Sequence, residues 1–257
     1  MGITPESIIL RSGTVAEFTE LAKRRLWEIH QFRGFSRTSH LLIECELETP
    51  HPFADNRFHS GILSGESLEK FVQQLSTFDE RFILKMTFLQ FVDIFEHWLR
   101  DVLRAILAHP PRVYRTKSVR ANDVLSAPTL EEAKIRVIDE ELEGVIRGQP
   151  CNWFSYIRTE LEVQLPDKKS RQKFQEIKAT RDVWVHNDGY ANDTYFEKAG
   201  KKARVKRDVL NARLEISPVY FQESYDLILG LLEELGATLS EKFDQQILSY
   251  YSKQSGS

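Results

Sequence analysis

The stretch that most constrains the fold runs from residue 66 to residue 109, where the chain contains neither glycine nor proline. Strong helix formers dominate it, and its second part, from Glu80 to Ala108, is apolar on almost every side of a helix. Such a helix is expected at the centre of a core or in a subunit interface. Thr77 and Glu80 have the spacing of a capping box, which predicts that a shorter helix ends there and the longer one begins.

Helical periodicity and capping signals also predict helices over residues 14–32, 129–146, 153–163 and 167–186, and a last long helix after Ser217-Pro218. Residues 187–207 are polar and predict a loop, and Leu41 to Glu48 predicts a short strand or an extended arm. The fold class is therefore all-α. We expect an N-terminal extension or small subdomain over residues 1–65 and a helical domain over residues 66–257.

Composition excludes several classes of protein. With 41% apolar and 28% charged residues among 257, the chain matches an ordinary globular protein. The net charge of −3 gives no whole-chain attraction for a polyanion, so any nucleic-acid contact must come from local clusters of Lys and Arg. No apolar run is long enough to cross a membrane, and Cys45 and Cys151 lack metal-ligand spacing. We expect a cytoplasmic protein with no membrane contact, no metal and no cofactor.

One polar residue stands where the 167–186 helix should be apolar. At about 100° per residue, Phe174, Ile177 and Val185 fall on one stripe, with Arg181 in its middle. A guanidinium there costs several kcal/mol unless it is paired or faces a wet cleft, because Arg does not deprotonate. Asp182 and His186 are four residues apart, so they lie side by side next to that stripe.

Two interpretations of these three residues stay open. Arg181 could be a structural arginine that pairs with an acid such as Glu96, and Asp182 with His186 could be a surface pair. Alternatively, the three side chains form a functional site at the end of one helix.

The surrounding residues favour a functional site. The stretch Glu176-Ile177-x-x-x-Arg181-Asp182-x-x-Val185-His186-Asn187-Asp188-Gly189-Tyr190 resembles the signature of the HEPN superfamily of helical ribonucleases, in which Arg precedes His by four to six residues. The segments around Trp153-Phe154 and Phe91 to Asp101 are also similar to bacterial HEPN proteins. The resemblance covers roughly residues 66–246. It implies a HEPN-like helical bundle that forms a homodimer, with two Arg/His motifs in one composite cleft.

The resemblance also implies a chemistry: metal-independent endonucleolytic cleavage of RNA, in which a ribose 2′-hydroxyl attacks its own phosphate. His186 would be the general base or acid, and Arg181 would hold the scissile phosphate. Asp182, where the family often has Asn, would orient the other two. The implied setting is a bacterial toxin or antiviral-defence effector with an antitoxin or defence-system partner. The toxin subgroup that is modified on tyrosine has Tyr two residues after the motif His, whereas this chain has Asp188 there.

Basic residues crowd the segment after the motif and predict an RNA-binding surface with bases stacked on tyrosine. The predicted RNA-binding residues are Asn187, Tyr190, Lys198, Lys201, Lys202, Arg204, Lys206 and Arg207. A solvated loop explains the same cluster equally well. His97, within the apolar helix, is expected to be a core or interface residue rather than a catalyst. The alternative to an endoribonuclease is a non-catalytic HEPN module that binds RNA or a protein, and a purely structural helical protein is a third option.

Overall fold

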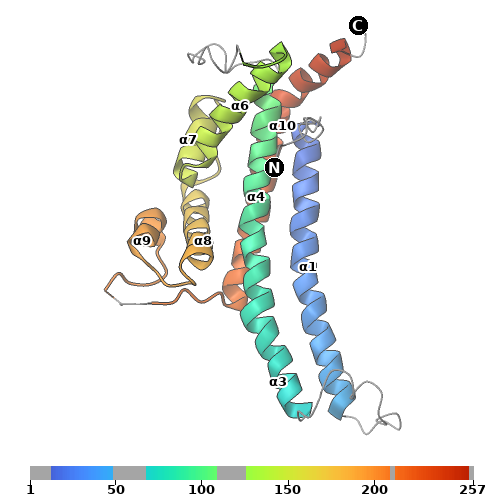
Figure 1. Ribbon diagram of the computed structural model, residues 1–257, viewed down its shortest axis with the longest axis vertical. Helices are drawn as coiled ribbons and strands as arrows, with labels where there is room; N and C mark the ends of the chain where they lie inside the picture. Colours follow the sequence, from blue (N-terminus) through green and yellow to red (C-terminus); the bar gives the residue numbers. More distant parts are fainter. Residues whose placement is uncertain (1–12, 49–67, 109–125, 209–211, 255–257) are drawn as a thin grey trace.

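The computed structural model describes residues 13–48, 68–108, 126–208 and 212–254, and it is built almost entirely of helices (Figure 1). Within these ranges no β-strand is formed, and the β-type pairing is limited to an isolated antiparallel bridge between Tyr190 and Arg213. The predicted all-α class is confirmed.

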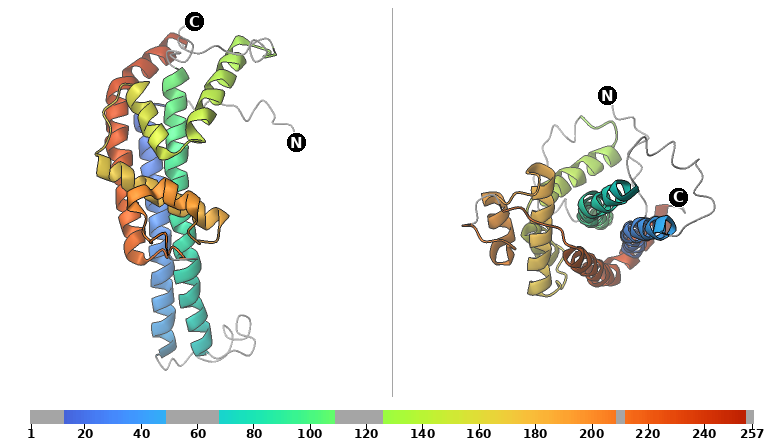
Figure 2. Two further views of the ribbon diagram at one scale, coloured as in Figure 1. Left: turned by 90° about the vertical axis from the view of Figure 1, so that its left-hand side faces the viewer. Right: turned by 90° about the horizontal axis from the view of Figure 1, so that it is seen from below.

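Three long helices, α1 (Val15–Glu48), α4 (Leu84–Ala108) and α10 (Pro218–Gln254), pack against one another and enclose the main core (Figures 1 and 2). The predicted central role of the apolar helix is confirmed, because α4 contacts α1, α6, α8 and α10. Its fully buried side chains include Phe88, Phe91, Phe95 and Leu103. Leu26 of α1 and Leu232 of α10 belong to the same core.

The N-terminal helix is part of this bundle. The main-chain N–H groups of Val15 and Ala16 donate to the carboxylate of Asp244 on α10, at 2.7 and 3.2 Å, which satisfies the first turn of α1. A Cβ on Gly236 would lie 2.5 Å from the Thr19 side chain, so α1 and α10 approach closely there. Residues 1–65 therefore supply a central helix, and their segments 1–12 and 49–65 lie outside the described residues.

Two secondary-structure predictions are wrong: the strand or extended arm at residues 41–48 and the helix break at Thr77. Residues 41–48 belong to α1, because Leu and Glu favour helix and nothing in this segment opposes it. The predicted break at Thr77 is absent: α3 (Leu68–Phe78) continues through a π-helical turn, Asp79–Ile83, directly into α4. Phe78 keeps helical angles, φ −66° and ψ −43°, so no N-cap forms there.

The remaining helices lie on one side of α4 (Figure 2). They are α6 (Leu130–Ile146), α7 (Pro150–Thr159), α8 (Lys168–His186) and α9 (Asp193–Ala199), with a 3₁₀ turn at Gly200–Lys202. The caps predicted at Thr129 and Ser217 are confirmed, since Thr129 accepts from the Glu132 N–H and Ser217 from the Tyr220 N–H, both at 3.2 Å. The predicted 187–207 loop contains α9, which begins where Asn192 caps it.

Candidate functional site

The motif residues lie at the C-terminal end of α8, beside α4. The Arg181 guanidinium is turned toward α4, where it donates to the carboxylate of Asp93 and, at 3.3 Å, to Asp182. Its side chain is about 20% exposed, and its Nε is buried without a hydrogen-bond partner. The structure therefore brings Arg181 and Asp182 into contact at a half-buried position.

A network of alternating charges surrounds this pair. Asp182 accepts from Lys178 of α8 at 3.3 Å and from Lys198 of α9 at 2.9 Å. Lys178 also forms an ion pair with Glu96 of α4, with its Nζ 2.6 Å from the Glu96 Oε1. Three cations thus face three carboxylates across α4, α8 and α9, and each buried charge has a compensating partner. We call these six residues the charge network: Asp93, Glu96, Lys178, Arg181, Asp182 and Lys198.

The charge network keeps both motif groups ionised. Burial alone would raise the pKa of Asp182, but Lys178 and Lys198 outweigh it, and the pKa lies below its ordinary value. For Arg181, burial lowers the pKa, but the charge and hydrogen bond of Asp93, together with the charges of Glu96 and Asp182, leave it above its ordinary value. Arg181 therefore remains a cation, which is the state that binds a phosphate.

His186 stands apart from the other two motif residues. Its side chain is exposed and makes no hydrogen bond or ion pair with any described residue, so the surface pair with Asp182 does not form. Five residues of helix separate it from Arg181 by about 140° around the axis and about 7.5 Å along it. Within one chain, Arg181 points toward α4 while the His186 imidazole is open to solvent.

The apolar stripe on which Arg181 was expected is only partly buried. Phe174 and Ile177 are fully buried, as predicted, but Val185 is about 47% exposed, so the expectation that it packs inward is wrong. The reason is that α8 has passed beyond the main core by its last turn. Arg181 lies at this boundary between core and surface.

The expected acidic partner of Arg181 is also different. Glu96 binds Lys178, and Arg181 binds Asp93, three residues earlier on the same side of α4. Nothing in the sequence pattern separates two acids that are one helical turn apart. His97 is exposed rather than buried in the core, and its Nδ1 donates to the main-chain oxygen of Asp93 at 2.7 Å.

A tight turn after the motif holds the end of α8 in place. Asp188 and Gly189 adopt left-handed angles, φ 48° and 83°, and a Cβ on Gly189 would lie 2.7 Å from the Trp184 ring. The Trp184 indole N–H donates to the Leu214 carbonyl at 2.8 Å, and the Leu214 N–H donates to the Gly189 carbonyl at 2.8 Å. The turn is therefore fastened to the segment that precedes α10.

The predicted RNA-binding residues have different environments in the structure. Three are engaged within the protein: Lys198 binds Asp182, Arg204 binds Glu176, and Arg207 binds Asp193. Asn187 closes the turn by donating to the Tyr190 carbonyl at 2.6 Å. Tyr190, Lys201 and Lys206 are exposed, and Lys202 is half-buried. The cluster in the sequence is thus divided between structural ion pairs and exposed side chains.

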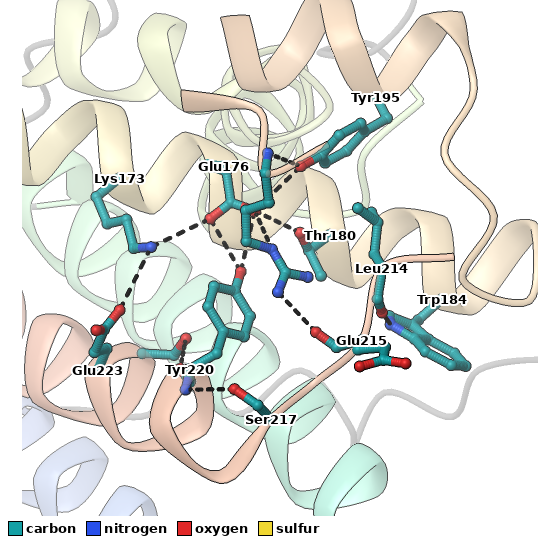
Figure 3. Close-up of polar contacts among 12 residues, drawn as sticks. Lys173, Glu176, Thr180, Trp184, Tyr195, Leu214, Glu215, Ser217, Tyr220 and Glu223 are labelled. Carbon is teal, nitrogen blue, oxygen red and sulfur yellow. Dashed lines mark hydrogen bonds and ion pairs between the residues drawn. The ribbon is translucent and has the colours of Figure 1, made fainter. Parts of the chain in front are cut away.

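A second polar centre lies on the same helix. Glu176 is completely buried and accepts hydrogen bonds from Thr180 at 2.7 Å and from the Tyr220 hydroxyl at 3.1 Å (Figure 3). The Arg204 Nε donates to it at 3.1 Å, and the Tyr195 hydroxyl lies 3.4 Å away. Burial is the main cause that raises the pKa of Tyr195 and Tyr220, so both hydroxyls stay protonated and can donate.

This Glu176 centre connects three elements, because Tyr195 belongs to α9 and Tyr220 to α10. The Arg204 guanidinium lies 3.7 Å from the Tyr220 ring centre and donates to the Glu215 carbonyl at 2.7 Å. The only signal for it in the sequence is an acid between the apolar residues Phe174 and Ile177. It fixes the segment that carries the turn after His186.

Among the described residues, no group of three His, Cys, Asp or Glu side chains is placed to hold a metal ion, and no helix is long and apolar enough to cross a membrane. Cys151 is exposed. Comparisons of the chain with protein-family models, curated proteins and solved structures find no match. Its function is therefore inferred from the side chains of the site.

Proposed function

We propose that this chain is a HEPN-type endoribonuclease that cleaves RNA without a metal ion, through Arg181 and His186. The observation that carries this proposal is the placement of His186. Its imidazole is exposed and unengaged among the described side chains, at the end of the helix on which a charge network holds Arg181 near the surface. A proton-transfer group and a phosphate-binding group thus share one helix end.

The proposed reaction begins with a ribose 2′-hydroxyl. One His186 takes its proton while the 2′-oxygen forms a bond to phosphorus and the bond from phosphorus to the 5′-oxygen breaks. A second imidazole gives a proton to the departing 5′-oxygen. The products are a 2′,3′-cyclic phosphate and a 5′-hydroxyl, and no water is consumed in this step.

Arg181 stabilises the charge on the phosphate in this proposal. A guanidinium can hold two phosphate oxygens at once, but here it must first leave Asp93 or Asp182. When Arg181 moves, Asp182 remains held by Lys178 and Lys198, and the Asp93 side chain is about 27% exposed, so water can solvate its carboxylate. The charge network therefore positions Arg181 and still allows it to change partner.

A homodimer completes the proposed site. Arg181 and His186 point to different sides of α8, so one copy offers one imidazole and an arginine turned away from it. A second copy brings another Arg181 and His186 to the same cleft and supplies the acid as well as the base. The resemblance to HEPN proteins supports this assembly, together with a setting in bacterial toxicity or antiviral defence.

The test is cleavage of single-stranded RNA in the presence of EDTA. We expect the unsubstituted protein to cut RNA, and His186→Ala to lower the rate at least a hundredfold, because general acid–base catalysis contributes about 10²–10⁴-fold. His97→Ala is the matched control, since His97 is also exposed but lies on α4, and its activity should be unchanged. Equal cleavage by both histidine variants would overturn the proposal.

A second candidate function is RNA binding without cleavage. The observation in its favour is that Asp93 and Asp182 already neutralise Arg181. It predicts salt-dependent binding of RNA that His186→Ala does not weaken, and intact RNA after long incubation.

A further inference from the structure

Aromatic rings and cations alternate along one continuous line of contacts that leads to the end of α8. At its far end, Phe78 and Phe82 stack with ring centres 5.1 Å apart. The Lys85 ammonium lies 5.8 Å from the Phe82 ring centre and 5.2 Å from that of Trp184, so it joins α4 to α8. The line thus crosses from the π-helical turn to the motif helix.

Arg213, which also forms an exposed ion pair with Asp188 at 3.3 Å, continues the same line from Trp184 to Tyr190. Its guanidinium lies 4.8 Å from the Trp184 ring centre and 5.6 Å from that of Tyr190. Trp184 precedes His186 by two residues on α8, and Tyr190 follows it by four, so the line reaches the segment that carries the proposed catalytic residue. We call these six residues the ring–cation track: Phe78, Phe82, Lys85, Trp184, Tyr190 and Arg213.

Three aromatic rings of the track are exposed to solvent. Phe78, Phe82 and Tyr190 are about 49%, 46% and 41% exposed, which is unusual for large rings close to one another. An open groove of about 450 Å³ adjoins the stacked pair, lined by Lys70, Gln73, Gln74, Thr77, Phe78, Arg81 and Phe82. The groove shares the rings of Phe78 and Phe82 with the track, and Lys70 and Arg81 place positive charge in its lining.

We propose that the ring–cation track binds single-stranded RNA, with bases stacked on Phe78, Phe82 and Tyr190 and phosphates held by Arg81, Lys85 and Arg213. Single-stranded nucleic acids are bound by this combination of aromatic platforms and cations. The inference rests on the proposed function, because it takes the RNA bound on the track to be the substrate that His186 cleaves. Apart from Tyr190, it assigns substrate binding to residues outside the motif and outside the basic segment 198–207.

A protein partner fits this surface less well. Lysine is depleted at the cores of protein–protein interfaces, whereas Lys85 lies between the rings of Phe82 and Trp184. A polyanion with flat bases satisfies the rings and the cations together. A second copy of this chain on the track is therefore an outcome that the test must distinguish.

Binding is measured by fluorescence anisotropy with a labelled ten-nucleotide oligouridine, using full-length protein with the His186→Ala substitution so that the probe stays intact. Phe82→Ala should weaken binding about 5-fold to 100-fold, since one base loses its stacking platform. Lys85→Gln should weaken it less and lower the salt dependence by about one ion. Phe35→Ala is the matched control, because Phe35 is a more exposed ring on α1 and lies off the track.

Binding by Phe82→Ala and Lys85→Gln proteins within twofold of the reference would overturn the inference, as would an equal loss with Phe35→Ala. A lower oligomeric mass in the track variants with unchanged RNA affinity would assign the surface to a second copy and also overturn it. Circular dichroism and thermal unfolding confirm that each variant is folded. If RNA binds through the track but the unsubstituted protein never cleaves it, only the proposed function is rejected. If the track variants cleave RNA as fast as the reference protein, only the assignment of the track is rejected.

Discussion

At the scale of single residues, the turn after the motif depends on Gly189. Its φ of 83° is a conformation that L side chains rarely adopt, and the indole of Trp184 fills the space where a Cβ would point. The same indole is held by its hydrogen bond to Leu214. Glycine is therefore required here for two separate reasons, backbone conformation and close approach.

Gly189→Ala should lower the free energy of unfolding by about 2 kcal/mol or more, from the left-handed backbone and the contact with Trp184. Urea denaturation measures the change. Gly144→Ala is the control, because Gly144 lies within α6 with no atom near its Cβ position. There alanine should stabilise by about 1 kcal/mol, from helix propensity. Equal effects of the two substitutions would contradict this role of Gly189.

Glu176 is the second residue on which the structure depends. Glu176→Gln keeps the shape of the side chain but removes the charge that faces Arg204, so we expect a loss of about 3 kcal/mol in stability. Glu223→Gln is the control, since both acids lie 3.7 Å from Lys173 but Glu223 is exposed. Chemical denaturation of the two variants should separate a buried network from a surface pair. A loss of less than about 1 kcal/mol in the free energy of unfolding for Glu176→Gln would show that the charge of Glu176 is not required to compensate Arg204.

At the scale of helices, α8 is held to α4 and α9 by charges as well as by apolar packing. Asp182 is the point at which these charges meet, because it contacts Lys178, Arg181 and Lys198. Its pKa lies below the ordinary value in the folded protein, so the unfolded chain binds a proton at higher pH than the native one. The contribution of Asp182 to stability is present above its pKa in the unfolded chain, and it is lost as the pH falls through its pKa in the folded protein.

Asp182→Asn should therefore destabilise the protein at pH 7, by about 1–3 kcal/mol, and the difference from the unsubstituted protein should shrink toward about pH 3. Unfolding in urea at a series of pH values measures it. Asp226→Asn, at an exposed position of α10, should cost little at any pH. A deficit for Asp182→Asn that is independent of pH would show that its carboxylate is not stabilised by the network.

Helices were more predictable from the sequence than the contacts between them. Caps at Thr129 and Ser217 are local signals, and they mark real helix starts. The Thr77 to Glu80 pattern fails because a π-helical turn absorbs it within a continuous helix. The partner of Arg181 could not be chosen, because Asp93 and Glu96 share one face of α4 and only the position of α8 decides between them.

At the scale of the whole molecule, α1 and the continuous α3–α4 helix extend well beyond α8 and α9 (Figure 1). The ring–cation track connects the α3–α4 helix to α8 through Lys85 and Trp184. That α1 joins the core could not be predicted from its sequence, because its apolar residues pack against α10, which lies far along the chain. The exposure of Phe78 and Phe82 could not be predicted either, since both look like core residues in the sequence. Long-range packing decides both.

The proposed composite site requires two chains. Sedimentation equilibrium should give a mass twice the 29.9 kDa of one chain, because a single copy presents one imidazole to the substrate. A protein that cleaves RNA as a monomer over the whole concentration range would contradict the composite site.

The most direct test of the central claim is to determine the ends of RNA cut by the purified protein in EDTA, by mass spectrometry. Attack by the 2′-hydroxyl through His186 predicts a 2′,3′-cyclic phosphate and a 5′-hydroxyl, and neither product with His186→Ala. Replacing the ribose at the mapped cleavage position with 2′-deoxyribose should also stop the cut. Intact RNA with the unsubstituted protein, or the same products from His186→Ala, would contradict the assignment of Arg181 and His186 as a catalytic site.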